Sequence, residues 1–210
     1  MHYKPLVERL DFMKNQFKKL SIDEYEIISE EPNEEWKLDR PQERARKLSH
    51  FGESSRPMTN AEMSLAWKHF LFLKKASKSH RPSLVLEDDA LLHDDFVAKI
   101  NEILLSNEWD IVFPGSGCNL RKPGQGLIRV SHPASKCTDS YLVTPTSAKK
   151  LYSTMLESVD LAIDWELNYQ MMFHDLRVHW HEPPIVMQMS QNGNWTSSIN
   201  GKQENLFRSF

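Results

Sequence analysis

The feature of this sequence that most constrains its fold is the alternation of helical patterns with short apolar runs. Apolar residues recur every three or four positions over 6–20 and 59–77, a spacing that gives a helix one apolar face. The runs between such segments, for example Ser83–Leu86, are too short for helices and are typical of buried strands. Helices that alternate with apolar strands predict an α/β protein, in which helices cover a sheet.

Periodicity and turn residues also predict where individual elements begin and end. Thr59 and Glu62 have the spacing of a capping box at the start of one helix. Asp94 or Asp95 is expected to cap a later helix. Strands are expected at 25–28, 83–86, 110–113, 127–130, 140–144, 178–180 and 185–189. Helices are expected at 6–20, 42–51, 59–77, 96–106, 147–156 and 164–173.

Composition and charge narrow the classes of function. The chain has 210 residues, of which 40% are hydrophobic, enough for a single compact domain with a buried core. A net charge of −3 disfavours nucleic-acid binding, which usually relies on a basic excess. Cys118 and Cys137 form no CxxC motif, so no cysteine-based zinc site is expected. With no apolar leader and no stretch of membrane-spanning length, a cytoplasmic location is predicted.

Glu87, Asp88 and Asp89 follow directly after the apolar run 83–86 and are the strongest candidates for chemistry. Three adjacent carboxylates repel one another unless a cation or hydrogen bonds neutralise them. Alternation along a strand would put Glu87 and Asp89 on one side and Asp88 on the other. Two oxygen ligands on one side suit a hard divalent ion such as Mg²⁺ or Mn²⁺, whose open positions phosphate oxygens can fill. The plain alternative is a solvated acidic turn that leads into a helix cap.

The segment 84–90 (LVLEDDA) resembles the metal-binding strand end of family-25 glycosyltransferases, a family that includes lipooligosaccharide and procollagen galactosyltransferases. Further segments resemble other parts of the family in the same order, over about 6–200. They are 6–25 with Arg9, 56–69 with Glu62 and His69, 138–151 with Tyr141, 164–166 (DWE), and 183–199 with Gln188. Two departures are visible. Residues 1–5 do not replace the hydrophobic strand ending in Asn-Leu that normally precedes the first helix, and Trp67-Lys68-His69 stands where a Ser-His pair is usual.

The resemblance implies a GT-A-like, Rossmann-type mixed sheet flanked by helices in a single compact domain. Residues 1–110 would form the half that binds the nucleotide sugar and the metal, and 111–210 the half that binds the acceptor. It also implies a UDP-sugar donor such as UDP-galactose, Mn²⁺ or Mg²⁺ as cofactor, and a glycan, lipid-linked glycan or protein acceptor. In this interpretation Asp89 binds the metal, Glu87 contacts the metal or the ribose, and Asp88 binds donor hydroxyls.

Asp164 and Glu166 are the candidates for the catalytic base. An inverting transfer needs a carboxylate within hydrogen-bond reach of the acceptor hydroxyl. Both acids stand at the start of an expected helix, and Asp164 is preferred because the family motif begins with Asp at this place. The plain alternative is that Asp164 caps the helix and Glu166 is a favourable first-turn acid.

Five further residues are weaker candidates. Glu62 and His69 are seven residues apart and share a helix face, from which they could bind the donor, although the capping box already explains Glu62. His181 could supply a nitrogen ligand to the metal. Tyr141 could stack or hydrogen-bond in the site, with burial in the core as its alternative. Gln188 is expected near the site from the resemblance alone.

Two other functions stay open at this stage. A non-catalytic module of the same fold could bind sugar nucleotides or glycans, and the missing first strand motivates this interpretation. An unrelated metal-dependent phosphoryl-transfer enzyme or hydrolase would need a second acidic cluster about 4 Å from the first ion. Asp94 and Asp95 are the nearby acids, and they fit helix caps better.

Overall fold

The structure is a computed structural model that describes residues 1–32, 58–106, 108–131, 134–157, 159, 161–190 and 195. These residues form five α-helices, one short 3-10 helix and two β-sheets, so the protein has the mixed α/β architecture that the sequence predicts. The helix expected at 42–51 lies outside the described residues. None of the helices in the described ranges combines the length and the apolar character needed to cross a membrane.

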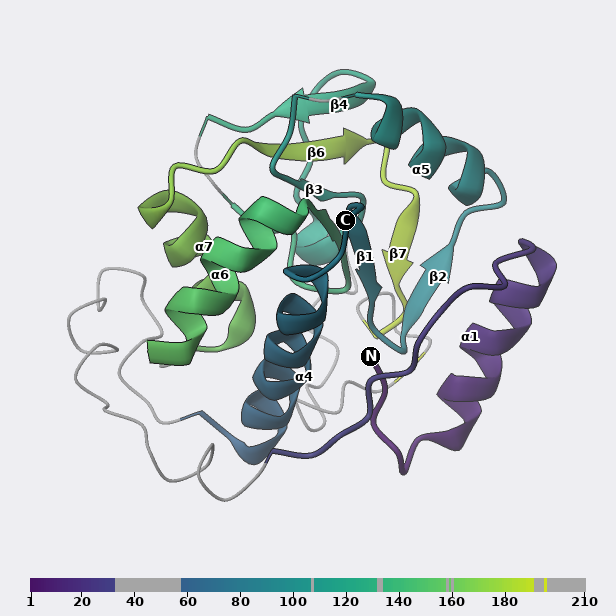
Figure 1. The fold of residues 1–210 in the computed structure, drawn as a ribbon. Helices are drawn as coiled ribbons and strands as arrows, with labels where there is room; N and C mark the ends of the chain where they lie inside the picture. Colours follow the sequence, from purple (N-terminus) through teal and green to yellow (C-terminus); the bar gives the residue numbers. More distant parts are fainter. Residues whose placement is uncertain are drawn as a thin grey trace, which may run out of the picture.

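The larger sheet has five strands in the order β1-β5-β3-β6-β4 (Figure 1). Within this sheet β3 and β6 run parallel, and every other pair of neighbours is antiparallel. The sheet is therefore mixed, as expected. Its strands are β1 Ser83–Leu86, β3 Ile111–Phe113, β4 Gly126–Arg129, β5 Ser140–Val143 and β6 Val178–Glu182.

One face of the sheet is covered by three helices, which lie side by side in Figure 1. Alternate strand residues, among them Val85, Tyr141 and Trp180, join these helices in one apolar cluster. The alternation follows from the period of two along a strand. The helices are α4 Asn60–Ala76, α6 Pro145–Glu157 and α7 Ile163–Phe173.

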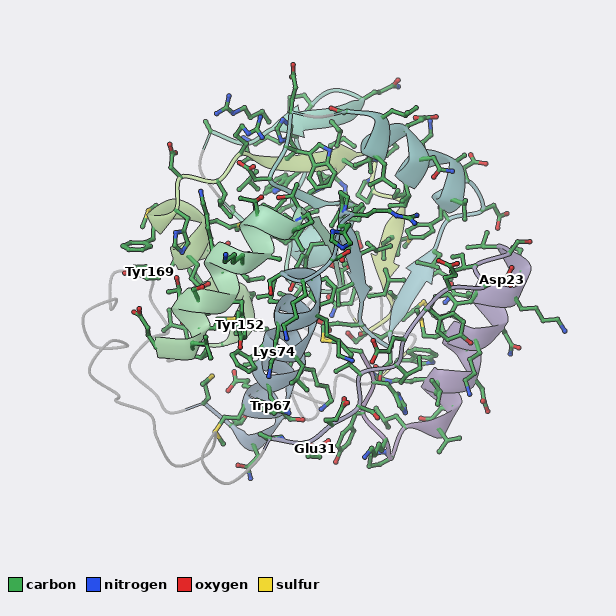
Figure 2. The ribbon with its side chains drawn as sticks, viewed as in Figure 1. Asp23, Glu31, Trp67, Lys74, Tyr152 and Tyr169 are labelled. Carbon is green, nitrogen blue, oxygen red and sulfur yellow. The ribbon has the colours of Figure 1, made fainter. Side chains whose placement is uncertain are left out.

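Aromatic side chains join the helices on this face. Figure 2 labels Trp67 on α4 and Tyr152 on α6, which lie on the same side of the molecule. Phe70 stands between them, with ring centroids 5.4 Å from Trp67 and 5.1 Å from Tyr152. Such ring contacts add to the apolar burial that holds α4 against α6.

The opposite face of the sheet packs against a second apolar cluster. The intervening strand residues, such as Val112 and Leu142, belong to it. Its other members come from α1, α5 and a two-stranded antiparallel sheet, which lie together in Figure 1. These elements are α1 Val7–Lys19, α5 Phe96–Leu105, β2 Ala90–Leu92 and β7 Val186–Gln188.

Most of the predicted elements in the described ranges are confirmed to within two residues at each end. The prediction of a strand at 25–28 is wrong, because these residues form no strand. The main-chain hydrogen bond from the His2 N–H to Ile28 O (2.9 Å) does not make a strand pairing. The strand β2 was not predicted, since three residues directly after an acidic run carry too short an apolar pattern.

The helix starts show which capping expectations hold. The box is confirmed, because the Glu62 N–H donates to Thr59 Oγ1 (3.2 Å) and the Thr59 N–H donates to Glu62 Oε2 (2.7 Å). Asp95 is the N-cap residue of α5, but its side chain makes no capping hydrogen bond. Asp94 instead pairs with Lys19 of α1 at 2.6 Å.

The directions of the strands bring several chain segments to one edge of the larger sheet. Leu86, the last residue of β1, pairs with Ser140, the first residue of the antiparallel β5. Phe113, the last residue of β3, pairs with Trp180 near the end of the parallel β6. The segments that follow β1, β3 and β6 therefore meet the segment that precedes β5, and this edge holds the candidate site.

Candidate functional site

The acids 87–89 form a turn at the end of β1 rather than a continuation of the strand. The Glu87 N–H donates to Asp139 O (2.9 Å), and the Ala90 N–H donates to Glu87 O (3.2 Å). This turn separates the three carboxylates, with Glu87 and Asp89 acting electrostatically on each other and Asp88 directed toward α1. Because the acids lie in a turn, strand alternation does not decide where their side chains lie, and the charge of Asp88 still acts on both Glu87 and Asp89.

Glu87 is held from two sides at the end of β1. Its Oε1 accepts a hydrogen bond from Thr138 Oγ1 (2.7 Å) and lies 3.5 Å from His69 Nε2. Burial raises the pKa of Glu87, the Thr138 hydrogen bond opposes that rise, and the charge of Asp88 adds to it. Glu87 is therefore a fixed carboxylate whose ionisation a nearby cation would favour.

Asp89 is buried and its Oδ1 has no hydrogen-bond partner. Burial raises the pKa of Asp89 to about 6, with the charge of Glu87 as the next cause and a hydrogen bond from Ser190 as the main opposing one. Its main-chain oxygen accepts a hydrogen bond from the Met189 N–H (2.9 Å), just after β7. The carboxylate thus lies between the end of β1 and the end of β7.

Asp139 lies beside these acids, directly before β5. It is fully buried, and neither carboxylate oxygen has a hydrogen-bond partner. Burial raises the pKa of Asp139 well above its usual value, the charges of Glu87 and Asp89 add to this rise, and weak interactions with the main-chain N–H groups of Ser140 and Ser116 oppose it. Gly115 leaves room for the group, because a Cβ atom on Gly115 would collide with the Asp139 carboxylate.

His69 and Tyr141 form a buried pair behind Glu87. His69 Nδ1 lies 3.0 Å from the Tyr141 hydroxyl, and the two rings are stacked with centroids 5.6 Å apart. Burial lowers the pKa of His69 well below its usual value, so the ring is neutral. Burial likewise raises the pKa of Tyr141, with the charge of Glu87 as the second cause. The structure therefore brings His69 and Tyr141 to the acids, with the His69 ring between Tyr141 and Glu87.

Asp88 is bound by the beginning of the chain and by α1. Its Oδ1 accepts a hydrogen bond from Arg9 Nη1 (3.0 Å), and its Oδ2 lies 3.0 Å from His2 Nδ1 and accepts from the Tyr3 N–H (2.9 Å). Arg9 and His2 are themselves buried. This arrangement ties the acidic turn to α1 and gives the Asp88 carboxylate partners within the protein.

Gln188 lies at the edge of the same region. It pairs with Ala90, the residue after Asp89, in the register of β7 with β2. Its N–H donates to Ser116 Oγ (3.3 Å), which belongs to the segment that follows β3, and its side-chain Oε1 is buried without a hydrogen-bond partner. The structure therefore places Gln188 close to the acidic turn.

Lys136 and Glu182 form an ion pair at the end of β6. Lys136 Nζ donates to Glu182 Oε1 at 2.6 Å, and both side chains are buried. Lys136 also lies over the ring of Trp180, 4.9 Å from its centroid. This pair fixes the segment that leads into Asp139. Sequence reasoning missed it, because neither residue belongs to a recognisable motif.

Asp164 and Glu166 lie in the first turn of α7, and the N-cap position belongs to Ala162. Asp164 Oδ1 accepts a hydrogen bond from the Trp165 N–H (2.9 Å), and its side chain is partly exposed. Glu166 is fully buried, and its Oε1 accepts a hydrogen bond from Gln170 Nε2 (2.7 Å). The alternative in which Asp164 is the cap residue is therefore wrong.

The first turn of α7 is connected to the acids through the segment before β5. The Ser135 N–H donates to Asn168 Oδ1 (2.6 Å), and Ser135 Oγ donates to the main-chain oxygen of Asp164 (3.4 Å). Ser135 precedes Asp139 by only a short stretch of chain. Asp164 thus lies on an element that the 134–139 segment links directly to the acidic turn.

Two of the predicted site residues have other partners in the structure. His181 Nδ1 donates to Pro183 O (2.8 Å), and the charges that act on its pKa come from Lys99 and Glu102 of α5 and from Glu182. His181 therefore faces the α5 side of the sheet rather than the acids. Glu62 lies in the first turn of α4, where its side chain accepts the Thr59 N–H in the capping box described above.

The family resemblance implies a divalent cation, and the acids at this edge of the sheet are the residues that could bind it. In the described part of the chain, no three His, Cys, Asp or Glu side chains are arranged to hold a metal ion by themselves. Asp89 and Asp139 nevertheless present buried carboxylate oxygens without partners. Mg²⁺ typically takes one or two protein carboxylates and fills its other positions with substrate phosphates and water. The donor set therefore fits an ion that binds together with a phosphate-bearing ligand.

Asp139 is the acid at this edge that sequence reasoning did not select. A signal was present, because an aspartate directly precedes an apolar run of strand length at 140–144. Its significance depends on the pairing of Leu86 with Ser140, which places the start of β5 against the acidic turn. No pattern within one sequence reveals that register.

Residues 4–117, more than half of the chain, match the family model described as Glycosyltransferase family 25 (LPS biosynthesis protein). The match includes α1, α4 and the acidic turn, and it ends before the segment that leads into β5. No curated protein matched the chain.

Proposed function

The chain belongs to glycosyltransferase family 25, and from this premise we propose that it transfers a hexose, galactose first of all, from a nucleotide sugar such as UDP-galactose. The acceptor is a hydroxyl group of a glycan, a lipid-linked glycan or a protein, and the transfer inverts the anomeric configuration. A divalent cation, Mn²⁺ or Mg²⁺, takes part. A GT-A-type arrangement in one domain is part of the same proposal, with the acidic turn in the half that binds the donor.

The single observation that carries the proposal is the set of buried acids at the end of β1. Asp89 keeps an unpartnered carboxylate oxygen beside Glu87, whose own carboxylate is fixed by Thr138. Buried like charges are unfavourable, and the charge of Arg9 offsets the burial of Glu87 and Asp89 only in part, because burial still raises the pKa of both acids. A divalent cation at the site would supply the remaining compensation. The chemistry that a divalent cation supplies here is neutralisation of a diphosphate and of the charge on a leaving nucleotide.

The chain's own residues supply the positions for donor and cation. In this proposal Asp89 binds the cation directly, and Glu87 contacts the cation or the ribose of the donor. His69 Nε2 lies 3.5 Å from Glu87 Oε1, and its other nitrogen is engaged by Tyr141. Gln188 offers an unused amide oxygen near the same turn. Asp88, bound by Arg9 and His2, holds the turn against α1.

Asp164 is the proposed base. A base must reach the acceptor hydroxyl, so it needs an accessible carboxylate. Asp164 is partly exposed, whereas Glu166 is fully buried and bonded to Gln170. Accessibility therefore favours Asp164, the same residue that the family resemblance favours.

The test is release of UDP from UDP-galactose with Mn²⁺, in the presence and absence of acceptor glycans. We expect Asp89→Asn to lower turnover by at least about 100-fold, since a metal stabilises the transition-state charge by several kcal/mol. Asp95→Asn is the matched control, because Asp95 is an exposed aspartate near the acidic turn whose side chain caps nothing. Circular dichroism and the Tm verify that both variants fold.

Two results would contradict the proposal. One is full activity of Asp89→Asn, which would remove the cation from this turn. The other is the absence of UDP release with every donor and metal tried, while nucleotide binding persists. That second result would identify a non-catalytic module that binds sugar nucleotides.

A further inference from the structure

Asp139 is a carboxylate that packing alone does not account for. It is fully buried, and neither of its oxygens accepts a hydrogen bond of good geometry. The main-chain N–H groups of Ser140 and Ser116 act on it weakly, since burial still raises its pKa. Lys136 is nearby, but its ammonium group is engaged by Glu182 at 2.6 Å. Burying an ionisable group without a partner is strongly unfavourable compared with an apolar residue of the same size. A ligand that supplies the missing partner would explain why the fold holds a carboxylate here.

The position of Asp139 identifies the group with which it acts. Its main-chain oxygen accepts the Glu87 N–H, so it lies directly beside the acidic turn. The charges of Glu87 and Asp89 both act on its side chain. Asp89 also has an unpartnered buried oxygen, whereas Glu87 Oε1 is engaged by Thr138. Asp89 and Asp139 are therefore the two aspartates of this group with carboxylate oxygens left over.

The main chain around Asp139 is shaped to accommodate its side chain. Gly115 follows β3 and approaches the Asp139 carboxylate so closely that any Cβ atom would collide with both oxygens and the carboxyl carbon. The space therefore holds a carboxylate in one place, at the edge where the segments after β1 and β3 meet. A fixed carboxylate with unused oxygens is the arrangement that a cation ligand requires.

We infer that Asp139 is a second aspartate ligand, beside Asp89, for the divalent cation of this site. The inference rests on the proposed function, which supplies the diphosphate-bearing donor. Two protein carboxylates suffice for such an ion, because phosphate oxygens and water fill its remaining positions. Asp139 thus takes the part that sequence reasoning assigned to His181, which lies on the α5 side of the sheet.

The experiment measures Mn²⁺ binding in the presence of UDP by the loss of the EPR signal of free Mn²⁺. The variants are Asp139→Asn and Asp89→Asn. Asp110→Asn is the matched control, since it makes the same chemical change at the other end of the sheet, directly before β3. His181→Gln tests the residue that Asp139 replaces in this assignment. The Tm of each variant is measured without metal.

We expect Asp139→Asn and Asp89→Asn to raise the Mn²⁺ Kd by at least about tenfold, the low end of what loss of even an outer-shell partner causes. Asp110→Asn and His181→Gln should bind Mn²⁺ as the wild type does. Without metal, Asp139→Asn should raise the Tm by about 2–4 °C, because it replaces a buried ionisable group, whose charged form burial disfavours, by a neutral amide. A merely structural Asp139 would give a lower Tm and unchanged Mn²⁺ binding.

The outcomes separate this inference from the proposed function. If the wild type binds Mn²⁺ with UDP and Asp139→Asn binds it equally well, Asp139 is no ligand, while the proposed function stands. If the wild type shows no Mn²⁺ binding with UDP, the metal-dependent function itself fails. If Asp139→Asn does not fold, the inference is tested on the wild-type protein by NMR instead. Mn²⁺ with UDP should then broaden the NMR amide signals of Ser140 and Ala90, and unbroadened signals would overturn the inference.

Discussion

Lys136 Nζ lies 2.6 Å from Glu182 Oε1, in a part of the protein where neither side chain reaches solvent. Burial lowers the pKa of Lys136, and the hydrogen bond and charge of Glu182 oppose that effect. The pair joins the end of β6 to the segment that leads into Asp139. The position of the candidate site therefore depends on an ion pair from outside the motifs that the sequence displays.

Replacing Lys136 by methionine should be strongly destabilising. The change leaves the Glu182 carboxylate buried without its cation, a loss of about 3–5 kcal/mol in the free energy of unfolding. Lys99→Met is the matched control, because Lys99 pairs with Glu102 at an exposed position, where an ion pair contributes about 0–1 kcal/mol. Urea unfolding measures both. Equal losses of the free energy of unfolding in the two variants would show that the buried ion pair stabilises the protein no more than the exposed one.

Asp88→Asn should affect stability and leave Mn²⁺ binding unchanged. Its carboxylate is bonded by Arg9, His2 and the Tyr3 N–H, so the neutral amide loses a charge-assisted pair with the buried Arg9. We expect a lower Tm with the Mn²⁺ Kd of the wild type. Asp94→Asn, which removes an exposed pair with Lys19, provides the comparison. A weakened Mn²⁺ affinity in Asp88→Asn would instead give Asp88 the donor-binding role first predicted for it.

His69 and Tyr141 should be energetically coupled. His69→Phe leaves the buried Tyr141 hydroxyl without its 3.0 Å partner, at a cost of about 1–3 kcal/mol, and Tyr141→Phe does the same to His69. The double variant His69→Phe/Tyr141→Phe leaves neither polar group without its partner, so its free energy of unfolding should recover toward that of the wild type. If His69 also serves the site through Glu87, UDP release stays low in the stable double variant. Full activity there would reduce His69 to a packing residue.

The Asp110–Arg177 pair should make part of the stability depend on pH. Burial alone would raise the pKa of Asp110, but hydrogen bonds from the side chain and main chain of Arg177 outweigh it, so the pKa is lowered. A carboxyl whose pKa is lower in the folded than in the unfolded state stabilises the protein at neutral pH. That contribution is lost as the pH falls through the folded-state pKa.

Asp110→Asn should accordingly have a lower Tm than the wild type at pH 7. The difference should shrink as the pH falls below the unfolded-state pKa of about 3.9 and disappear once the folded-state carboxyl is protonated as well. Arg177 is largely exposed, which keeps the effect small. A Tm difference that does not change between pH 7 and pH 3 would mean that the pair does not account for the effect.

Asp164→Asn should lower the rate of transfer by about 100-fold or more, the contribution of a general base, without changing donor affinity. Glu166→Gln should act mainly on stability, because Glu166 is buried and bonded to Gln170 within α7. Single-turnover transfer and the Kd for UDP distinguish the two effects. If Glu166→Gln abolishes transfer in a protein with an unchanged Tm, the base lies two positions later than proposed.

Local patterns were enough for the five α-helices and for every strand of the described residues except β2. The capping box at Thr59 and Glu62 and the apolar periods of α1 and α4 lie within single segments, where neighbouring residues decide the structure. The acidic turn was evident for the same reason, since three carboxylates after an apolar run are unusual wherever they occur. The prediction of a strand at 25–28 was wrong, because an apolar run without a partner strand does not form a sheet.

The sequence by itself therefore determined the α/β class, the family and the acids at the end of β1. Only the tertiary structure decided the partners of those acids. The antiparallel register of Leu86 with Ser140 brings Asp139 to the turn, and strand alternation on β6 directs His181 to the α5 side. The physical reason is that the register of two strands, and the face to which a side chain points, depend on the burial of residues far apart in the chain. No local sequence pattern contains that information.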